Sequence, residues 1–241
     1  MATPYLNNKK GWPVITLEAN KMLGAIINVE SGGTPSTKEE DYWDGEIPWL
    51  TPKEITDNES IFISSTERKI TEQGLKESSA KLLPIGTVML TKRAPVGAVA
   101  VNAVPMCTNQ GFLNFTCGPN LRPKYLAYWF KANKEYLDAV ANGSTYPELY
   151  KSDLFEFELA LPPIHEQDKI IEFINSIQFQ LFLSKPLEQA ITSPTDIVQL
   201  QEQNIRLIRL RDMVLPLLMS GEIDIENLIY ETLNSNANGL M

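Results

Sequence analysis

Residues 86–116 read GTVMLTKRAPVGAVAVNAVPMCTNQGFLNFT. Two polar turns divide this stretch into three apolar runs, at 86–91, 98–104 and 111–116. Valine, phenylalanine and threonine favour strands, whereas glycine, proline and asparagine favour turns. The stretch therefore predicts short strands joined by turns, with the cations Lys92 and Arg93 on one turn and amide side chains on the other.

The same alternation of apolar runs and turn residues extends over the first 160 residues. The segment SGGTPST at 31–37 predicts a loop, because two glycines and a proline prevent regular structure. We predict an α+β domain of mostly antiparallel strands over residues 1–162. Its further strands are expected at Ala25–Val29, Ile61–Ile63 and Phe155–Ala160, and its helices at Thr71–Ser78 and Pro123–Ala141.

The pattern changes after Leu161–Pro162–Pro163, where apolar residues recur at helical spacing. Helices are predicted at His165–Leu183 and Asp196–Met219, separated by a segment with Pro186 and Pro194. We expect residues 163–225 to form a coiled-coil-like spacer, with packing of both helices on the first domain as the alternative. The stripe suited to pairing with another helix consists of Ile197, Leu200, Asn204, Leu207, Arg211 and Val214. Residues 226–241 are polar and are expected to form a flexible tail.

The composition is that of a folded but acidic protein, with 241 residues, 43% hydrophobic residues and a net charge of −9. Such a charge disfavours binding to DNA phosphates. The acidity is uneven, however, because residues 161–241 carry net −6 whereas residues 68–93 carry net +4. The two cysteines, Cys107 and Cys117, are too few for a disulfide framework. With no apolar signal-like start and no apolar stretch of about 20 residues, we expect a cytoplasmic protein without a membrane segment.

Patterns for catalysis are few. The single histidine, His165, has no nucleophile motif beside it, and no phosphate-binding glycine loop or Cys/His metal cluster occurs. Asp57 followed by Glu67 and Lys69 resembles the acidic and basic set of a magnesium-dependent nuclease. A polar turn between strands explains the same residues.

Residues suited to binding DNA are easier to identify in this sequence than catalytic residues. Lys92 and Arg93 can contact phosphates, and Asn109 and Gln110 can pair with phosphates or base edges. The alternatives are a solvated turn for the two cations and backbone capping for the two amides.

Several blocks of the chain together resemble one family, the specificity subunit of Type I restriction–modification systems. The resemblance runs from about Gly11 to Ile225 and keeps the family's order of blocks. The blocks are SGGTPSTKEEDYWDGEIPWLTPKEI (31–55), ITEQGLKESSAKLLPIGTVMLTKRAPVGAVAV (70–101), TNQGF (108–112), NGSTYPEL (142–149), KSDLFEFELALPPIHEQDKII (151–171) and LPLLMSGEIDI (215–225).

The resemblance implies a non-catalytic protein in which a target recognition domain reads one half of a bipartite DNA sequence. Helical regions of the family space two such domains and dock methyltransferase subunits. Those partners carry S-adenosylmethionine and methylate adenine, and a separate motor subunit carries ATP hydrolysis, Mg²⁺ and cleavage. We therefore expect no cofactor, metal or catalytic residue on this chain.

The DNA face that we expect combines the turn residues with nearby loops. Shared residues should position the DNA backbone, and base choice should lie in less typical stretches such as 56–69 and 102–107. The candidate DNA-binding residues are Gly32, Gly33, Thr34, Lys53, Arg68, Lys69, Lys92, Arg93, Asn109 and Gln110.

The chain carries one set of the family's blocks where the usual subunit has two. The resemblance then implies a half-subunit that pairs with a second copy through its helices and reads a palindromic, interrupted site. A truncated gene product is the alternative to that homodimer. Two other functions stay open at this point, a stand-alone nuclease using Asp57, Glu67 and Lys69, and a protein that occupies methyltransferase subunits without reading DNA.

Overall fold

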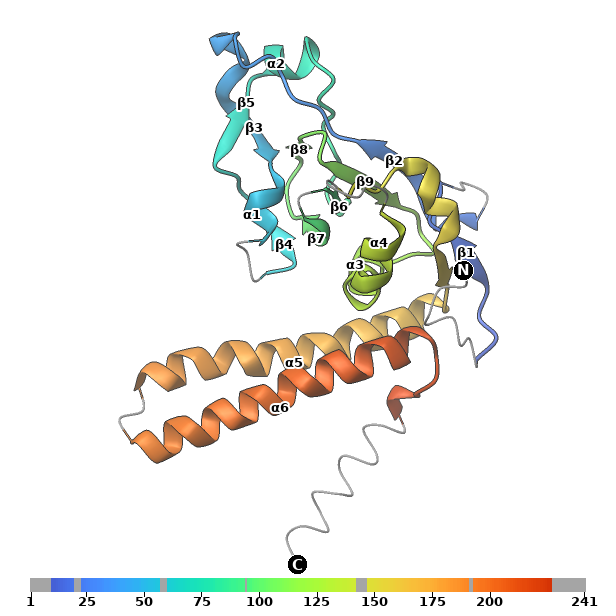
Figure 1. Cartoon of the computed structure of the whole chain (residues 1–241), viewed down its shortest axis with the longest axis vertical. Helices are drawn as coiled ribbons and strands as arrows, with labels where there is room; N and C mark the ends of the chain where they lie inside the picture. The colour runs from blue at the N-terminus through green and yellow to red at the C-terminus, as the bar shows by residue number, and fades with distance from the viewer. Residues whose placement is uncertain are drawn as a thin grey trace, which may run out of the picture. The chain divides into compact units, whose positions relative to one another are not determined.

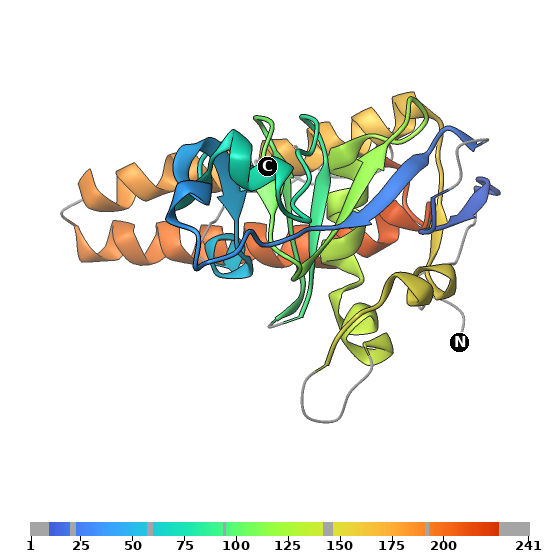
Figure 2. The same cartoon turned by 90° about the horizontal axis from the view of Figure 1, so that it is seen from above.

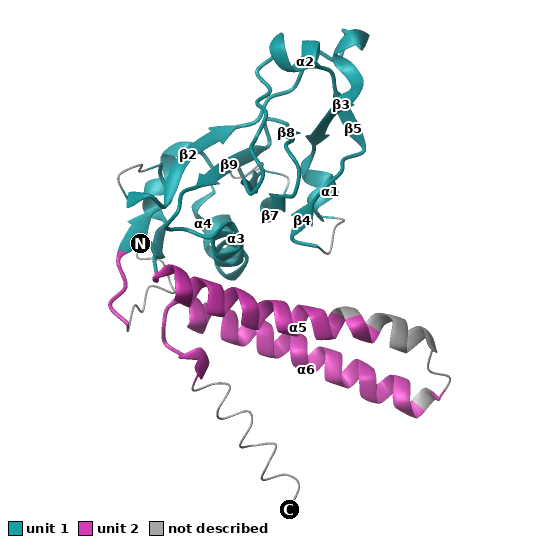
Figure 3. Ribbon diagram, turned by 180° about the vertical axis from the view of Figure 1, so that it is seen from behind, with its two compact units in different colours: residues 1–4, 14–161 teal, residues 5–13, 162–241 magenta. Residues whose placement is uncertain are grey.

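A computed structural model describes residues 10–19, 23–56, 60–93, 95–141, 147–190 and 193–226. These residues form two compact units (Figure 3). Unit 1 is residues 14–161, and unit 2 is residues 10–13 together with 162–226. None of the described helices is long and apolar enough to cross a membrane.

The centre of unit 1 is a five-stranded sheet with the order β2-β9-β6-β7-β4 (Figure 1). Its strands are β2 (Ile26–Ser31), β4 (Phe62–Ile63), β6 (Val88–Lys92), β7 (Val96–Asn102) and β9 (Phe112–Cys117). The three apolar runs of residues 86–116 become the adjacent antiparallel strands β6, β7 and β9. The short edge strand β4 pairs with β7 in parallel.

Two smaller sheets complete the strands described in unit 1. One has the order β5-β3-β8 and contains β3 (Trp43–Leu50), β5 (Arg68–Ile70) and β8 (Cys107–Thr108). In it, β3 is antiparallel to β5 and parallel to β8. The other pairs β1 (Val14–Thr16) with β10 (Glu158–Ala160). The prediction of an α+β fold with mostly antiparallel strands is confirmed.

Four short helices lie among these strands: α1 (Pro52–Thr56), α2 (Glu72–Lys76), α3 (Pro123–Ala132) and α4 (Lys134–Val140). Helix α2 lies within the predicted range Thr71–Ser78 and begins after Thr71, whose hydroxyl accepts a hydrogen bond from the Gly74 amide at 3.0 Å. The single helix predicted over Pro123–Ala141 is two helices. Asn133 divides them, and its side chain donates to the Trp129 carbonyl at 2.9 Å.

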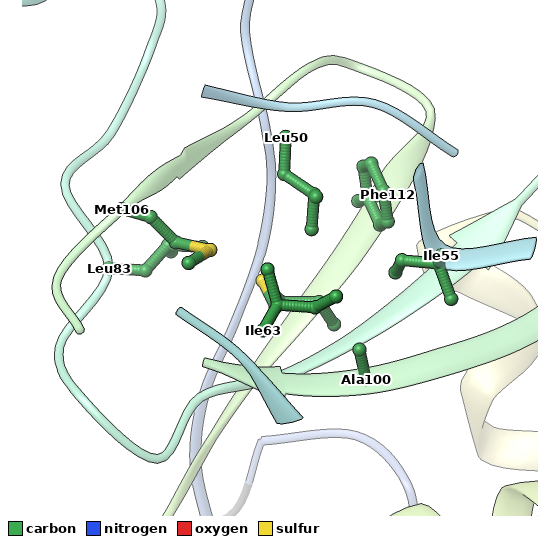
Figure 4. Close-up of a cluster of buried hydrophobic side chains, with 8 residues drawn as sticks. Leu50, Ile55, Ile63, Leu83, Ala100, Met106 and Phe112 are labelled. Atoms are coloured by element: carbon green, nitrogen blue, oxygen red, sulfur yellow. The ribbon is translucent and has the colours of Figure 1, made fainter. Parts of the chain in front are cut away.

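The buried core of unit 1 includes a cluster to which the five-stranded and the three-stranded sheet both contribute (Figure 4). Leu50 and Met106 approach from the β3–β8 side, and Met89, Ala100 and Phe112 come from the five-stranded sheet. Ile55 of α1 and Ile63 of β4 close the cluster. Because burial of apolar surface is the main favourable term in folding, this shared core stabilises the two sheets together.

Unit 2 is dominated by two long helices, α5 (Ile164–Ala190) and α6 (Pro194–Met219), which run side by side in Figures 1 and 2. The prediction that α5 ends before Pro186 is wrong, because the helix continues through this proline. An internal proline costs a helix about 3 kcal/mol but does not have to end it, and good helix formers (Leu187, Glu188, Gln189, Ala190) follow. Pro194 lies in the first turn of α6, where proline is favoured.

Several elements of unit 1 differ from the sequence prediction. The strand predicted over Phe155–Ala160 is only half strand, because residues Lys151–Glu156 form a 3-10 helix. The Asp153 carboxylate holds the start of that helix by accepting from the Tyr150 amide at 2.7 Å. The strands β1, β3, β5 and β8 and the helix α1 were not predicted.

Replacement of Asn102 by alanine should destabilise unit 1 by about 2–4 kcal/mol. The buried Asn102 amide donates to the carbonyls of Pro84 and Val104, both at 2.9 Å, and its Oδ1 accepts from the Thr87 amide at 2.7 Å. Alanine would leave these groups unpaired away from water. Urea unfolding followed by tryptophan fluorescence measures the loss, with the exposed Gln73→Ala as control. Equal stability of the two variants would contradict this role.

Candidate DNA interface

The turn Thr108–Gly111, here called the TNQG turn, hydrogen-bonds to three segments that are distant from one another in the sequence. Its Thr108 carbonyl accepts from the Gly33 amide at 2.9 Å, and its Asn109 amide donates to the Leu50 carbonyl at 3.0 Å. The Gly111 carbonyl accepts from the Lys92 amide at 2.8 Å. The turn therefore joins the loop at 31–37, the end of β3 and the end of β6.

The loop at 31–37 approaches the TNQG turn backbone against backbone. A Cβ atom on Gly32 would lie 2.2 Å from the Asn109 carbonyl oxygen, and one on Gly33 would lie 2.3 Å from the carbonyl carbon of Ser79. Such distances are far inside van der Waals contact. Both glycines are therefore required by the close approach, and neither offers a side chain to a ligand.

The two amide side chains of the TNQG turn have different roles. The Asn109 Oδ1 accepts from the Gly111 amide at 2.8 Å, so this side chain caps its own turn, as the capping alternative expected. The exposed Gln110 accepts a hydrogen bond from the Thr34 hydroxyl, which links the turn to the loop at 31–37. The structure therefore brings Gly32, Gly33, Thr34, Asn109 and Gln110 together.

Lys92 and Arg93 both face the carboxylate of Glu148. The Lys92 ammonium lies 2.9 Å from Glu148 Oε1, and its side chain is only 16% exposed. The Arg93 guanidinium lies 3.8 Å from Glu148 Oε2 and its side chain is 42% exposed. The Lys92 carbonyl also accepts from the Leu149 amide at 2.9 Å, so the end of β6 is fixed to this segment. Arg93 is the more accessible of the two cations.

A second group of candidate residues lies on β5, at the edge of the three-stranded sheet. The Arg68 guanidinium carbon lies 3.6 Å from the ring centroid of Trp43 and 5.4 Å from that of Trp49. The two indoles meet edge to face at 5.1 Å. Their N–H groups donate to the carbonyls of the 31–37 loop, Trp43 to Ser36 at 3.0 Å and Trp49 to Gly33 at 2.9 Å. Arg68 is thus stacked on a tryptophan pair that this loop orients.

The segment that leads into β5 is also held in place. The Thr66 hydroxyl accepts from the Trp49 amide at 3.0 Å and donates to the Arg68 carbonyl at 2.6 Å. The Glu54 carboxylate of α1 accepts from the Glu67 amide at 2.8 Å. Lys53, the neighbour of Glu54 on α1, is exposed. Lys69 is 44% exposed and lies 3.6 Å from the carboxylate of Glu46.

Residues 122–134 carry four cations and no acidic residue, but part of this positive charge is not open to solvent. The Lys124 ammonium lies 4.7 Å from the ring centroid of Phe62, and partial burial lowers the pKa of this lysine. Lys134 pairs with Asp138 at 2.6 Å, one helical turn away on α4. This stretch therefore contributes less open positive charge than its composition indicates.

Sequence reasoning missed the residues that hold the candidate site together, above all Glu148, Glu54 and Trp43. Glu148 lies far along the chain from the cations that it pairs with, and no local pattern connects them. The block at 43–49 was an available signal, because tryptophans are usually well buried and two of them here lie among charged residues.

The structure does not assemble the nuclease alternative from the residues that it describes. Lys69 pairs with Glu46, no ion pair joins Lys69 to Glu67 within the described chain, and Asp57 lies outside it. The described Asp, Glu, His and Cys residues form no group of three that could hold a metal ion. Both cysteines are free thiols, and burial raises the pKa of Cys107 and of Cys117 to about 12.

The predicted pairing stripe of α6 is the more shielded face of that helix. Val214 is buried and Ile197, Leu200, Asn204, Leu207 and Arg211 are partly buried. Because α5 runs alongside α6, this stripe suits the pairing of the two helices within one chain (Figure 2). Val198, Ile205 and Met213 are exposed apolar residues on α6 away from this stripe, and the exposed Ile208 flanks it.

Replacement of Lys92 by alanine should destabilise unit 1 by about 1–2 kcal/mol, because it leaves the partly buried Glu148 carboxylate without its nearest cation. Arg93→Ala should change stability by less than about 0.5 kcal/mol, because the Arg93 contact is longer and more exposed. Urea unfolding of both variants tests the difference. A larger loss for Arg93→Ala would contradict the assignment of Lys92 as the structural cation.

Known proteins resemble this chain in sequence and in fold. The chain is 45% identical over 163 residues to the Type I restriction enzyme MjaIX specificity subunit of Methanocaldococcus jannaschii, covering 67% of this chain and 36% of that protein. It is 30% identical over 162 residues to the EcoR124I/EcoR124II specificity subunit of Escherichia coli, covering 64% and 39%. The chain thus spans less than half the length of these relatives.

The fold has a solved counterpart in the HsdS subunit from Thermoanaerobacter tengcongensis, with a TM-score of 0.54 at 18% identity. That match covers 88% of this chain and 46% of the solved chain. The family model described as "Type I restriction modification DNA specificity domain" matches residues 18–193, which is most of this chain. The chain belongs to the family of Type I restriction–modification DNA specificity domains.

Proposed function

We propose that this chain is the sequence-specific DNA-recognition subunit of a Type I restriction–modification complex. The observation that carries the proposal is the match of residues 18–193 to the DNA specificity domain, which contains every described strand except β1. In this proposal the chain is not an enzyme. Methyltransferase subunits bound to it use S-adenosylmethionine to methylate adenine, and a motor subunit supplies ATP hydrolysis and Mg²⁺-dependent cleavage.

Unit 1 is proposed to contact DNA with the exposed members of the candidate set. Arg93, Gln110 and Lys53 have exposed side chains suited to phosphates or base edges. Gly32, Gly33 and Asn109 act through the backbone geometry that they permit, and Lys92 through its pair with Glu148. Arg68 and Lys69 belong to the segment 56–69, which we propose for base choice.

The partition of charge supports binding through unit 1. Residues 161–241 carry net −6 of the total −9, and these residues include the helices. A net negative chain is repelled by DNA, and the isolated chain can bind only through a few local phosphate contacts, so its binding should be weak and sensitive to salt. Methyltransferase subunits bound to the chain would then supply further phosphate contacts.

We also propose that two copies of the chain pair through the helices of unit 2. The chain carries one recognition unit and one helix pair, and a second copy would supply another of each. The exposed apolar residues of α6 suit such a surface, being Val198, Ile205, Ile208 and Met213, with Phe179 and Leu183 exposed on α5. We therefore propose that these exposed residues form the surface between two copies. The predicted stripe from Ile197 to Val214 instead suits the contact with α5 within one chain.

Co-expression of this chain with its methyltransferase should place N6-methyladenine in one bipartite DNA motif. Sequencing that detects the modified base gives the motif directly, and the methyltransferase expressed alone is the control. A palindromic motif is the expected result, because a two-fold dimer presents the same reader to both half-sites. Methylation without a motif would contradict the recognition role, and an asymmetric motif would contradict the homodimer.

Replacement of Ile205 by glutamate should shift the purified chain from dimer to monomer. A charge on the apolar face of α6 would have to be buried without a partner in the pair. Light scattering after size exclusion measures the mass. Gln203→Glu places the same side chain on another exposed position of α6 and should leave the dimer intact. A monomeric parent chain, or a dimeric Ile205→Glu variant, would contradict this surface.

A further inference from the structure

Arg68 lies at the edge of a sheet, against two tryptophans, in a position suited to reading DNA. Among the described residues, β5 is the outer strand of its sheet, and Arg68 on it is exposed. Arg68 stands directly opposite Trp49 of β3 in the strand register. Its guanidinium carbon lies 3.6 Å from the ring centroid of Trp43, and within the described chain no carboxylate lies close enough to form an ion pair with it.

This stacking restricts the guanidinium before any ligand arrives. Trp43 and Trp49 are 9% and 4% exposed, and each indole N–H is fixed by a carbonyl of the 31–37 loop. The backbone at Arg68 is fixed as well, because its carbonyl accepts from Thr66 at 2.6 Å. A cation over an aromatic face keeps its N–H edge free to donate. The side-chain entropy that an arginine usually loses on binding is therefore partly lost already.

The surroundings of Arg68 suit a base edge better than a phosphate. Glu46 is 96% exposed and lies 3.6 Å from the neighbouring Lys69, and the side chain of Glu67 is also exposed. Glu46 partly neutralises Lys69, so the neighbour of Arg68 adds little positive charge for holding a phosphate. A guanine presents O6 and N7 as two neighbouring acceptors in the major groove, and a fixed guanidinium matches them with two hydrogen bonds.

We propose that Arg68 reads a guanine through O6 and N7 in the major groove of the target, as a specificity-determining residue. The inference rests on the proposed function, because it requires that unit 1 reads DNA. Arg68 would decide one position of each half-site. The loop at 31–37 would support this reading through the tryptophan pair that it orients.

The test uses the full chain with its methyltransferase subunits and duplex oligonucleotides that carry the motif found by methylation mapping. Each guanine of the half-site is replaced in turn by 7-deazaguanine, which lacks the N7 acceptor. The parent complex should lose affinity at one of these positions, and exchange of that base pair should cost about tenfold to a hundredfold. Arg68→Ala should be insensitive to 7-deazaguanine at the same position.

Two matched variants separate base reading from charge and from folding. Lys76→Ala removes an exposed cation of helix α2 that lies outside the candidate set, and it should keep the 7-deazaguanine penalty. Arg68→Lys keeps the charge but not the two-pronged donor, and it should lose the discrimination as Arg68→Ala does. Thermal unfolding of all variants shows whether they fold equally.

The results that would overturn the proposal are distinct from one another. If Arg68→Lys restores affinity for target and unrelated DNA alike, Arg68 contacts a phosphate. If Arg68→Ala keeps every 7-deazaguanine penalty of the parent, Arg68 reads no guanine, although the chain still reads DNA. If the parent complex does not distinguish its motif from unrelated DNA, the proposed function fails and the reading by Arg68 fails with it.

Discussion

The backbone contact between the TNQG turn and the glycine pair of the 31–37 loop is the constraint on which the recognition unit depends. The Gly33 amide, the Leu50 carbonyl and the Lys92 amide all bond to this one turn. A side chain at Gly32 would prevent the approach. Because each bonded segment belongs to a different part of the unit, the turn sets how the three-stranded and five-stranded sheets lie together.

The same contact also reaches the tryptophan pair and Arg68. Gly33 donates to the turn through its amide and accepts from Trp49 through its carbonyl, so one residue connects the turn to the indoles. Hydrogen-bonded indoles in an edge-to-face pair have little freedom to rotate. Strain introduced at the glycines would therefore be transmitted to Arg68 without any contact between them.

Local patterns were enough to predict the strands around residues 86–116, because these strands are neighbours both in the sequence and in the sheet. The strand β3 escaped prediction for physical reasons. It contains Gly45 and Pro48, which weaken strand propensity, and Asp44 has a positive φ of 58°. Its partner β8 is two residues long and distant along the chain, and this parallel pairing leaves no local pattern. The extent of α5 was missed because tolerance of Pro186 depends on the rest of the helix.

In the candidate site as well, the sequence indicated which residues are suited to DNA but not which partners they contact in the fold. Residue types pointed to Lys92, Arg93, Asn109 and Gln110 because cations and amides on turns are suited to DNA. Their separate roles depend on partners that only the fold supplies: Glu148 shields Lys92, and Asn109 caps its own turn. Arg68 was a candidate only as one cation in a charged segment. Its contacts with Trp43 and Trp49, which give it a distinct role, depend on the fold and leave no local pattern. Turn chemistry builds the frame, whereas Arg68 lies exposed at the edge of the sheet. Under the proposed function, a changed residue at this edge would alter the DNA target without disturbing the frame.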